Sequence, residues 1–200
     1  MSNTSKKGFT LIELLVVIAI IAILAVVVVL TLNPAELLRQ ARDSNRVSDF
    51  ATIKSAISLY NEDVSTTTYL DNGTFNLYAS YASASTTTSS YETAATWGFL
   101  GSEAAVSATS SRGVTSVTAG WIPVNLSAIS SGAPISVWPV DPLNTGGNFY
   151  VYAATTTAGT WKIATKTESI KYSYNGSNDI ESTDGGSSTG TYEQGTNLAL

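Results

Sequence analysis

Carboxylates are the side chains of this 200-residue chain that could do chemistry, because it contains neither histidine nor cysteine. Without imidazole or thiol groups, the chain cannot build the usual zinc sites or the Ser/His and Cys/His pairs of nucleophilic enzymes. Hydrolysis by two carboxylates remains chemically feasible, but no local pattern selects a pair among the fifteen acids. The sequence therefore favours a protein that is not an enzyme and has no catalytic residue.

Hard oxygen ligands, of the kind that calcium takes, occur in the second half of the chain. They are Asp141, Asn144, Asp179, Glu181 and Asp184. Their spacing matches no EF-hand loop, and acids in a tail rich in glycine and serine are often simply solvated. These five residues are candidate calcium ligands, with solvated loop acids as the alternative.

Glu13 is a carboxylate of another kind, because it comes directly before a long apolar stretch. Residues 14–32 carry no charge, and only Thr31 among them is polar. An ionised carboxylate in the middle of a membrane costs about 2.5–3.5 kcal/mol on insertion scales. One explanation is that Glu13 reaches the membrane interface, where the helix dipole favours it by about 0.3–1 kcal/mol.

The apolar stretch predicts a helix that crosses a membrane. A helix over residues 9–32 would be roughly 36 Å long, against about 30 Å for a hydrocarbon core. Lys6 and Lys7 precede it, and the bias of basic residues toward the cytoplasm predicts the N-terminus inside and the C-terminus outside. A cleaved secretory signal peptide, which normally has a shorter apolar region, and an uncleaved signal anchor are the alternatives.

Residues 6–24, KKGFTLIELLVVIAIIAIL, resemble the type IV prepilin signal. The match combines the basic pair Lys6 and Lys7, then Gly8, Phe9 and a glutamate four residues after the phenylalanine. In that family a membrane peptidase cuts after the glycine, and the new amino terminus is usually methylated. The resemblance implies a leader peptide at residues 1–8, with Gly8 and Phe9 as the processing site.

The resemblance also implies an assembly role for Glu13, which would pair with the free amine of Phe9 in a neighbouring subunit. A low dielectric would strengthen that attraction but also raise the desolvation cost. The implied function is a structural subunit of a type IV pilus-like filament, built through the hydrophobic N-terminal helix.

The resemblance implies three kinds of partner: further copies of the chain, the prepilin peptidase/methyltransferase and a membrane assembly platform. Before assembly the chain would be a single-pass inner-membrane protein. After assembly it would belong to a cell-surface or periplasmic filament.

The remaining chain predicts the α+β class, with a long N-terminal helix packed on a small antiparallel sheet, as in the pilin fold that the resemblance implies. Pro34 predicts a kink between the transmembrane helix at 9–32 and an amphipathic helix at 33–62. The apolar face of the second helix comprises Leu38, Ala41, Phe50, Ile53, Ile57 and Tyr60.

One globular head is predicted over residues 63–200, with a Ser/Thr-rich loop region at 64–118 and a β-sheet region at 121–175. Alternating residues predict a hairpin with one face toward the core. Its two strands and two further candidate strands are 149–154, 161–167, 135–138 and 170–174.

Residues 138–152, WPVDPLNTGGNFYVY, resemble a loop and the strand after it in the major pseudopilin of type II secretion. In that family the C-terminal loops can bind calcium. A pseudopilin of a type II secretion or DNA-uptake system is therefore the first alternative function. A surface adhesin is the second, in which aromatic residues such as Trp97 and Trp121 bind sugars or surfaces instead of packing in the core.

The absence of cysteine departs from many type IV pilins, which close their C-terminal region with a disulfide. The head must then be held by packing, hydrogen bonds or a metal. Residues 63–200 contain ten acidic and four basic residues, a formal charge of −6. Nucleic-acid binding depends on clustered Lys and Arg, so we expect no nucleic-acid partner.

Overall fold

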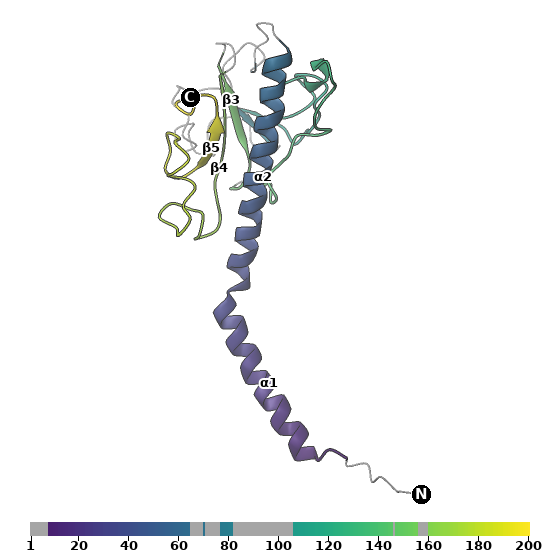
Figure 1. Cartoon of the computed structure of the whole chain (residues 1–200), viewed down its shortest axis with the longest axis vertical. Helices are drawn as coiled ribbons and strands as arrows, with labels where there is room; N and C mark the ends of the chain where they lie inside the picture. The colour runs from purple at the N-terminus through teal and green to yellow at the C-terminus, as the bar shows by residue number, and fades with distance from the viewer. Residues whose placement is uncertain (1–7, 65–69, 71–76, 82–105, 146, 156–159) are drawn as a thin grey trace, which may run out of the picture. The chain divides into compact units, whose positions relative to one another are not determined.

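The computed structural model describes residues 8–64, 70, 77–81, 106–145, 147–155 and 160–200 (Figure 1). The chain divides into two compact units, one ending at Leu38 and the other running over Arg39–Leu200. Lys6, Lys7 and Trp97 lie outside the described residues, as does the turn between the two predicted hairpin strands.

The first unit contains helix α1, Leu11–Leu32, which Thr10 caps at its N-terminus. At 22 residues it is roughly 33 Å long. The helix ends at Asn33, which adopts the left-handed conformation with φ 40° and ψ 70°. Its carbonyl accepts hydrogen bonds from the amides of Glu36 and Leu37, in the first turn of the next helix. The predicted interruption near Pro34 is confirmed, because the residue before a proline is pushed away from the α region.

Helix α2 spans Pro34–Asp63, and most of it belongs to the second unit. Its buried residues include Phe50, Ile53, Ile57 and Tyr60, as the apolar spacing predicted. The prediction was wrong for Leu38 and Ala41, which are exposed. Burial begins instead with two charged residues, Asp43 and Arg46.

Five strands form a mixed sheet in the order β2-β1-β3-β4-β5. Strands β3 and β4 form the predicted hairpin, with Ala154 opposite Trp161. The β1–β2 pair is parallel and the other pairs are antiparallel, so the small sheet is mixed where the sequence predicted an antiparallel one. The strand bounds are Leu77–Ala79 (β1), Val106–Ala108 (β2), Val151–Ala154 (β3), Trp161–Thr165 (β4) and Tyr192–Gly195 (β5).

Two candidate strands, 135–138 and 170–174, are not strands. The first lies between Pro134 and Pro139, and prolines cannot donate to a strand ladder. The second is a turn, in which the Ser173 amide donates to the carbonyl of Ser169. Three real strands lie instead outside the predicted 121–175 region, with β1 and β2 in the Ser/Thr-rich segment and β5 near the end.

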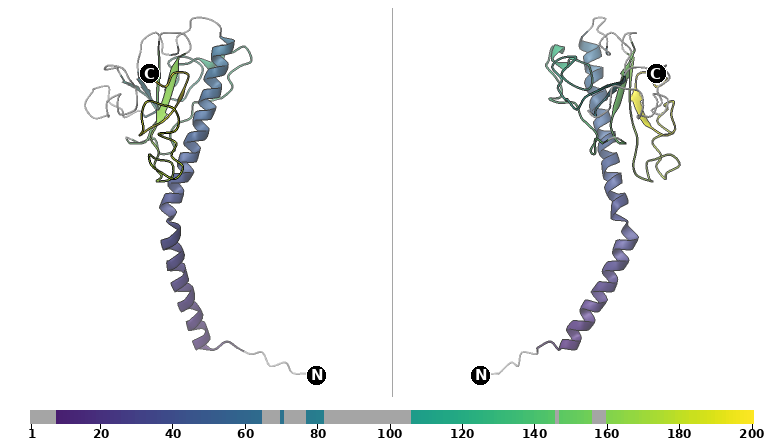
Figure 2. Two further views of the ribbon diagram at one scale, coloured as in Figure 1. Left: turned by 60° about the vertical axis from the view of Figure 1, so that its left-hand side comes forward. Right: turned by 180° about the vertical axis from the view of Figure 1, so that it is seen from behind.

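Both faces of the sheet are covered by other parts of the chain, although the sequence predicted that only one face would point toward a core. Figure 2 shows α2 running alongside the sheet in two views. Between them lies a core that joins Phe50 and Ile57 of α2 to Tyr152, Trp161 and Ile163 of the hairpin. The opposite face has a smaller core made of Leu77, Ala79, Phe149, Val151, Ala153 and Ala164. Lys162 lies on this second face and is fully buried, because residues near the C-terminus contact its ammonium group.

Candidate processing and assembly site

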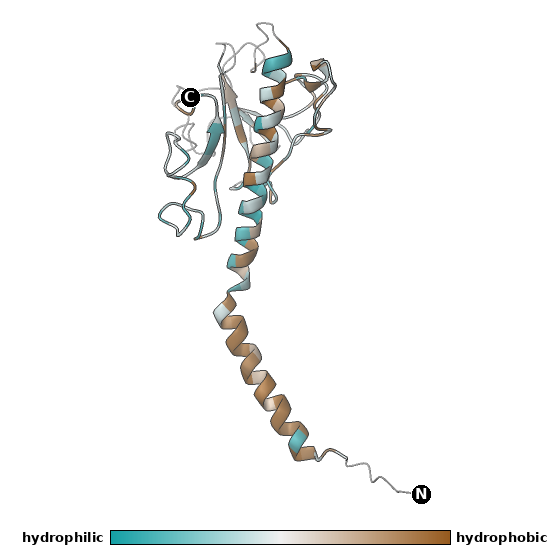
Figure 3. Ribbon diagram, viewed as in Figure 1, coloured by the Kyte–Doolittle hydropathy of each residue, from teal (hydrophilic) through white to brown (hydrophobic). Residues whose placement is uncertain are grey.

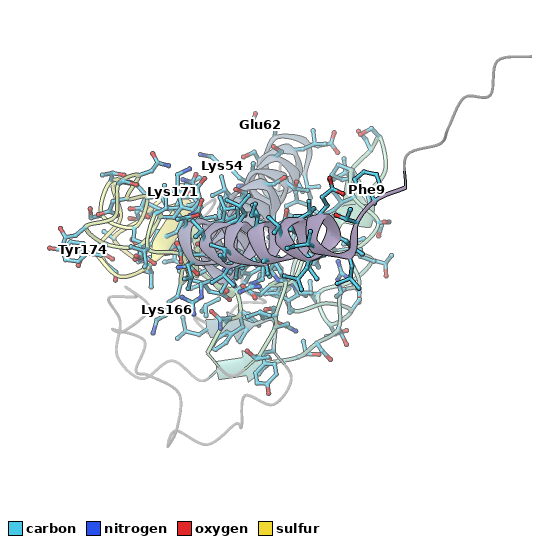
Figure 4. All side chains as sticks on the ribbon, turned by 90° about the horizontal axis from the view of Figure 1, so that it is seen from below. Phe9, Lys54, Glu62, Lys166, Lys171 and Tyr174 are labelled. Atoms are coloured by element: carbon cyan, nitrogen blue, oxygen red, sulfur yellow. The ribbon has the colours of Figure 1, made fainter. Side chains whose placement is uncertain are left out.

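The predicted cleavage site lies just before α1, in a segment without regular structure. Gly8 and Phe9 are both exposed, and the relative exposure of Phe9 is 90%. Figure 4 shows Phe9 at the N-terminal end of α1. A Cβ atom built on Gly8 would meet no other atom within 4 Å. The fold of this chain therefore does not itself require a glycine at position 8.

Gly8→Val is expected to block cleavage while leaving the fold unchanged. The side chain would have free space in this protein, so its effect would arise in the active site of the peptidase. Mass spectrometry of the membrane fraction should find only chains that begin before Phe9. A mature Phe9 terminus in the variant would contradict Gly8 as the cut site, and Gly8→Ala is the control with the smallest added side chain.

Thr10 and Glu13 form a capping box at the start of α1. The Glu13 amide donates to Thr10 Oγ1 at 3.3 Å, while Glu13 Oε2 accepts from the Thr10 amide at 2.8 Å and from Thr10 Oγ1 at 2.7 Å. The predictions for Glu13 did not include this role, although a threonine three residues before a glutamate is its signature. Thr10 and Glu13, the two members of this capping box, belong to the same chain. In the described part of the structure, no cation lies against the Glu13 carboxylate.

Helix α1 presents apolar side chains on all sides. None of its residues is buried, and Ile18, Ile21 and Leu24 are each more than half exposed. Figure 3 shows α1 hydrophobic along almost its whole length. The helical stretch Leu11–Asp63, which contains α1, has an apolar window with a mean hydropathy of 3.5 and is long and apolar enough to cross a membrane. Such a surface is unsuited to water and requires lipid or other apolar helices around it.

Comparison with known families supports this interpretation of the N-terminus. Residues 3–29 match the family described as the prokaryotic N-terminal methylation motif. The N-terminal segment of the chain is prepilin-like. The motif marks a substrate for N-terminal processing and is not a catalytic motif, and with the apolar helix it indicates a membrane-anchored precursor. No curated protein and no solved structure matches the chain.

The structure of this prepilin-like chain does not bring the five candidate calcium ligands together. Asp141 pairs with Arg46, whereas Asn144 hydrogen-bonds to Ser80. Asp179 and Asp184 accept from nearby loop amides, and Glu181 accepts from Thr167 and Tyr174. Within the described ranges, no three Asp, Glu, His or Cys side chains are grouped so that they could hold a metal ion. A calcium site built from these five residues does not fit the observed arrangement.

The buried Arg46 guanidinium joins α2 to two loops of the head. It contacts Asp141 through both carboxylate oxygens, at 2.6 and 3.1 Å, and Asp43 at 2.6 Å. A third carboxylate, Glu168, lies 2.8 Å away. Burial by itself would lower the pKa of Arg46, but these carboxylates raise it above its ordinary value. The loop that contains Asp141 is therefore fixed to α2 by an ion pair.

Trp121 belongs to the core and has no exposed surface. Its indole nitrogen donates to the carbonyl of Pro139 at 2.9 Å, and its ring lies near that of Tyr150. The core-packing alternative is confirmed for this residue. Trp121 therefore gives no support to an adhesin surface.

A second buried ion pair joins Lys162 of β4 to Glu193 of β5, with 2.7 Å between Nζ and Oε1. Both side chains have no exposed surface. Asp184 lies beside them and accepts from the amides of Gly186 and Glu193. Burial raises the pKa of Asp184 to about 6, and the neighbouring Glu193 carboxylate adds to the rise, while those amides and Lys162 oppose it.

Through Asp184, the folded state is expected to lose stability as the pH rises from weakly acidic to neutral. The folded chain holds this proton more tightly than the unfolded chain, whose ordinary pKa is 3.8. The contribution is complete below that value and is lost as the pH passes about 6.

Denaturant unfolding of the full chain in detergent, at about pH 4.5 and about pH 7.5, measures this contribution. The control is Asp184→Asn, which cannot titrate. The stability of wild type relative to the variant should fall at the higher pH. An unchanged difference at the two pH values would contradict the expectation.

Proposed function

We propose that this prepilin-like chain is a structural subunit of a type IV pilus-like filament. The observation that carries the proposal is α1, an apolar helix with no buried residue that begins inside a methylation motif. One helix of this kind can be dissolved in lipid, and several can bundle into the core of a fibre. The head, Arg39–Leu200, has its own buried core and would form the filament surface.

The processing step follows from the exposed Gly8–Phe9 segment. The prepilin peptidase cuts after Gly8, and the new amine on Phe9 is methylated. Cleavage removes the basic leader and places a positive charge four residues before Glu13. The precursor is held in the inner membrane with its N-terminus inside, and a membrane assembly platform moves it into the filament.

Glu13 then acts as the assembly residue. In the monomer the Oε2 atom of Glu13 accepts hydrogen bonds from Thr10 in the capping box. The second oxygen of the carboxylate has further acceptor sites. The Phe9 amine of a neighbouring subunit supplies a cation for that oxygen. A buried carboxylate with no cation is strongly unfavourable in an apolar helix bundle, so this pairing favours one register between neighbouring helices.

A pseudopilin of a secretion or DNA-uptake system is the second candidate. It is supported by the loop at 138–152, which the Asp141–Arg46 pair fixes against α2. Such a subunit undergoes the same processing and the same helix packing but forms only a short periplasmic filament. The location of the mature chain separates the two candidates.

Mass spectrometry of N-terminal peptides tests the proposal, using filaments sheared from intact cells and the membranes of the same cells. A methylated Phe9 peptide that is abundant in the sheared fraction supports the pilus subunit. The same peptide confined to membranes supports the pseudopilin. Chains that begin before Phe9 in both fractions would overturn both candidates and leave a simple membrane anchor.

A further inference from the structure

A lysine on an inner strand of the sheet is the least expected buried group of the head. Lys162 lies on β4 between β3 and β5, opposite Ala153 and Gly195, and has no exposed surface. An ammonium group loses its hydration when it is buried, and only charged or polar partners compensate for that loss. The environment of its Nζ atom therefore has to supply those partners.

Four oxygen atoms of described residues lie close to the ammonium, and these four come from residues 187–200. Glu193 Oε1 lies 2.7 Å from Nζ and Ser187 Oγ lies 3.0 Å away. The main-chain oxygens of Leu198 and Leu200 lie at 3.1 and 3.4 Å. A carboxylate, a hydroxyl group and two carbonyls are also the oxygen types that a hard cation such as calcium takes. Here the cation is a side chain of the protein, held by an ion pair to Glu193 and by hydrogen bonds to Ser187 and the two carbonyls, of which the one to Leu200 is long.

The neighbouring residues Asp184 and Gly186 help to position the Glu193 carboxylate beside Lys162. The Asp184 carboxylate accepts the Glu193 amide and, with its other oxygen, the Gly186 amide. A Cβ atom on Gly186 would overlap Glu193 Oε2, so only glycine permits this close approach. Strand β5 and the residues on either side of it, within 184–200, thus meet around one positive charge on the second face of the sheet.

We propose that the Lys162 ammonium is the built-in cation around which residues 184–200 fold, so that this segment is docked on the sheet without a metal ion or a disulfide. The chain has no cysteine to close this region. A calcium ion does not fit here, because the oxygen atoms that would bind it already surround Nζ. The lysine performs the crosslinking that such an ion would perform.

Hydrogen exchange of peptides from residues 184–200 tests the proposal in the full chain in detergent. Exchange in wild type should be the same with millimolar calcium and with a calcium chelator. Lys162→Ala should exchange at least roughly ten-fold faster in this segment, and added methylammonium should restore part of the protection by entering the vacated space. Lys171→Ala, which removes a lysine that stacks on Tyr172, is the matched control and should leave the segment unchanged.

Two further variants keep the test decisive if Lys162→Ala fails to fold. Lys162→Met keeps a side chain of similar length without the charge, so protection should fall and methylammonium should not restore it. Glu193→Gln keeps an oxygen acceptor but removes the negative charge, and it should also lose protection. Wild-type protection that disappears with the chelator, or full protection in Lys162→Met, would overturn the proposal.

Discussion

Glu13→Gln is expected to process normally after Gly8 but to assemble filaments about a hundred- to a thousand-fold less well than wild type. Removing one member of a buried ion pair costs about 3–5 kcal/mol, and each 1.4 kcal/mol is about ten-fold in an association constant. The loss would fall on assembly, because the proposed amine partner belongs to a neighbouring subunit. Filament yield after shearing measures it, and the mature Phe9 terminus in the membrane fraction shows that cleavage is intact.

The capping box makes glutamine the informative replacement at position 13. A glutamine at this position still accepts from the Thr10 amide and so keeps the cap. Glu13→Ala removes both the cap and the charge, and should assemble as poorly as Glu13→Gln. Thr10→Ala removes only the cap, worth about 0.5–2 kcal/mol of helix stability, and should retain most of the filament yield.

Two results would contradict the pairing role of Glu13. Normal filament yield from Glu13→Gln would show that the negative charge is not needed. A loss in Thr10→Ala equal to that in Glu13→Ala would show that the residue acts through the capping box alone.

Arg46→Leu is expected to destabilise the head by about 3–5 kcal/mol, because it leaves buried carboxylates without their cation. Asp43 and Asp141 have no exposed side-chain surface and both contact this guanidinium. The change also removes one of the two arginines that hydrogen-bond to Glu168. Burial alone would raise the pKa of Glu168, but its bonds to Arg42 and Arg46 lower it. Denaturant unfolding of the full chain in detergent measures the loss of stability.

Arg42→Gln is the matched control for Arg46. Arg42 also pairs with Glu168, at 2.5 Å, but its side chain is 28% exposed. Partly exposed ion pairs contribute about 0–1 kcal/mol, so this variant should be close to wild type in stability. If both variants lost the same stability, the burial of Arg46 would not be what makes its ion pairs important.

Local patterns made the N-terminal part of the chain predictable. These patterns involve residues that are close together in the chain. They are the apolar run at 14–32, the asparagine–proline step at Asn33, and the spacing of Gly8, Phe9 and Glu13. The structure has a helix and an interruption at those places. The β3–β4 hairpin was predictable for the same reason, because its strands are neighbours in the chain.

The buried charges were not predictable, because each depends on partners far away in the sequence. Arg46 and Asp141 are 95 residues apart, and the pattern around each is that of a solvated charge. Leu38 shows the converse, an apolar residue at helical spacing that is exposed.

The sequence by itself determined the processing signal, the membrane-length helix and the α+β class, since these depend on composition and short-range periodicity. Only the tertiary structure decided the mixed sheet, the burial of Lys162 and the separate roles of the candidate calcium ligands. Long-range contacts decide whether a charged side chain lies in water or is buried beside an opposite charge. The effect of that side chain on the stability of the fold depends on which of the two occurs. A linear pattern of charges does not contain this information.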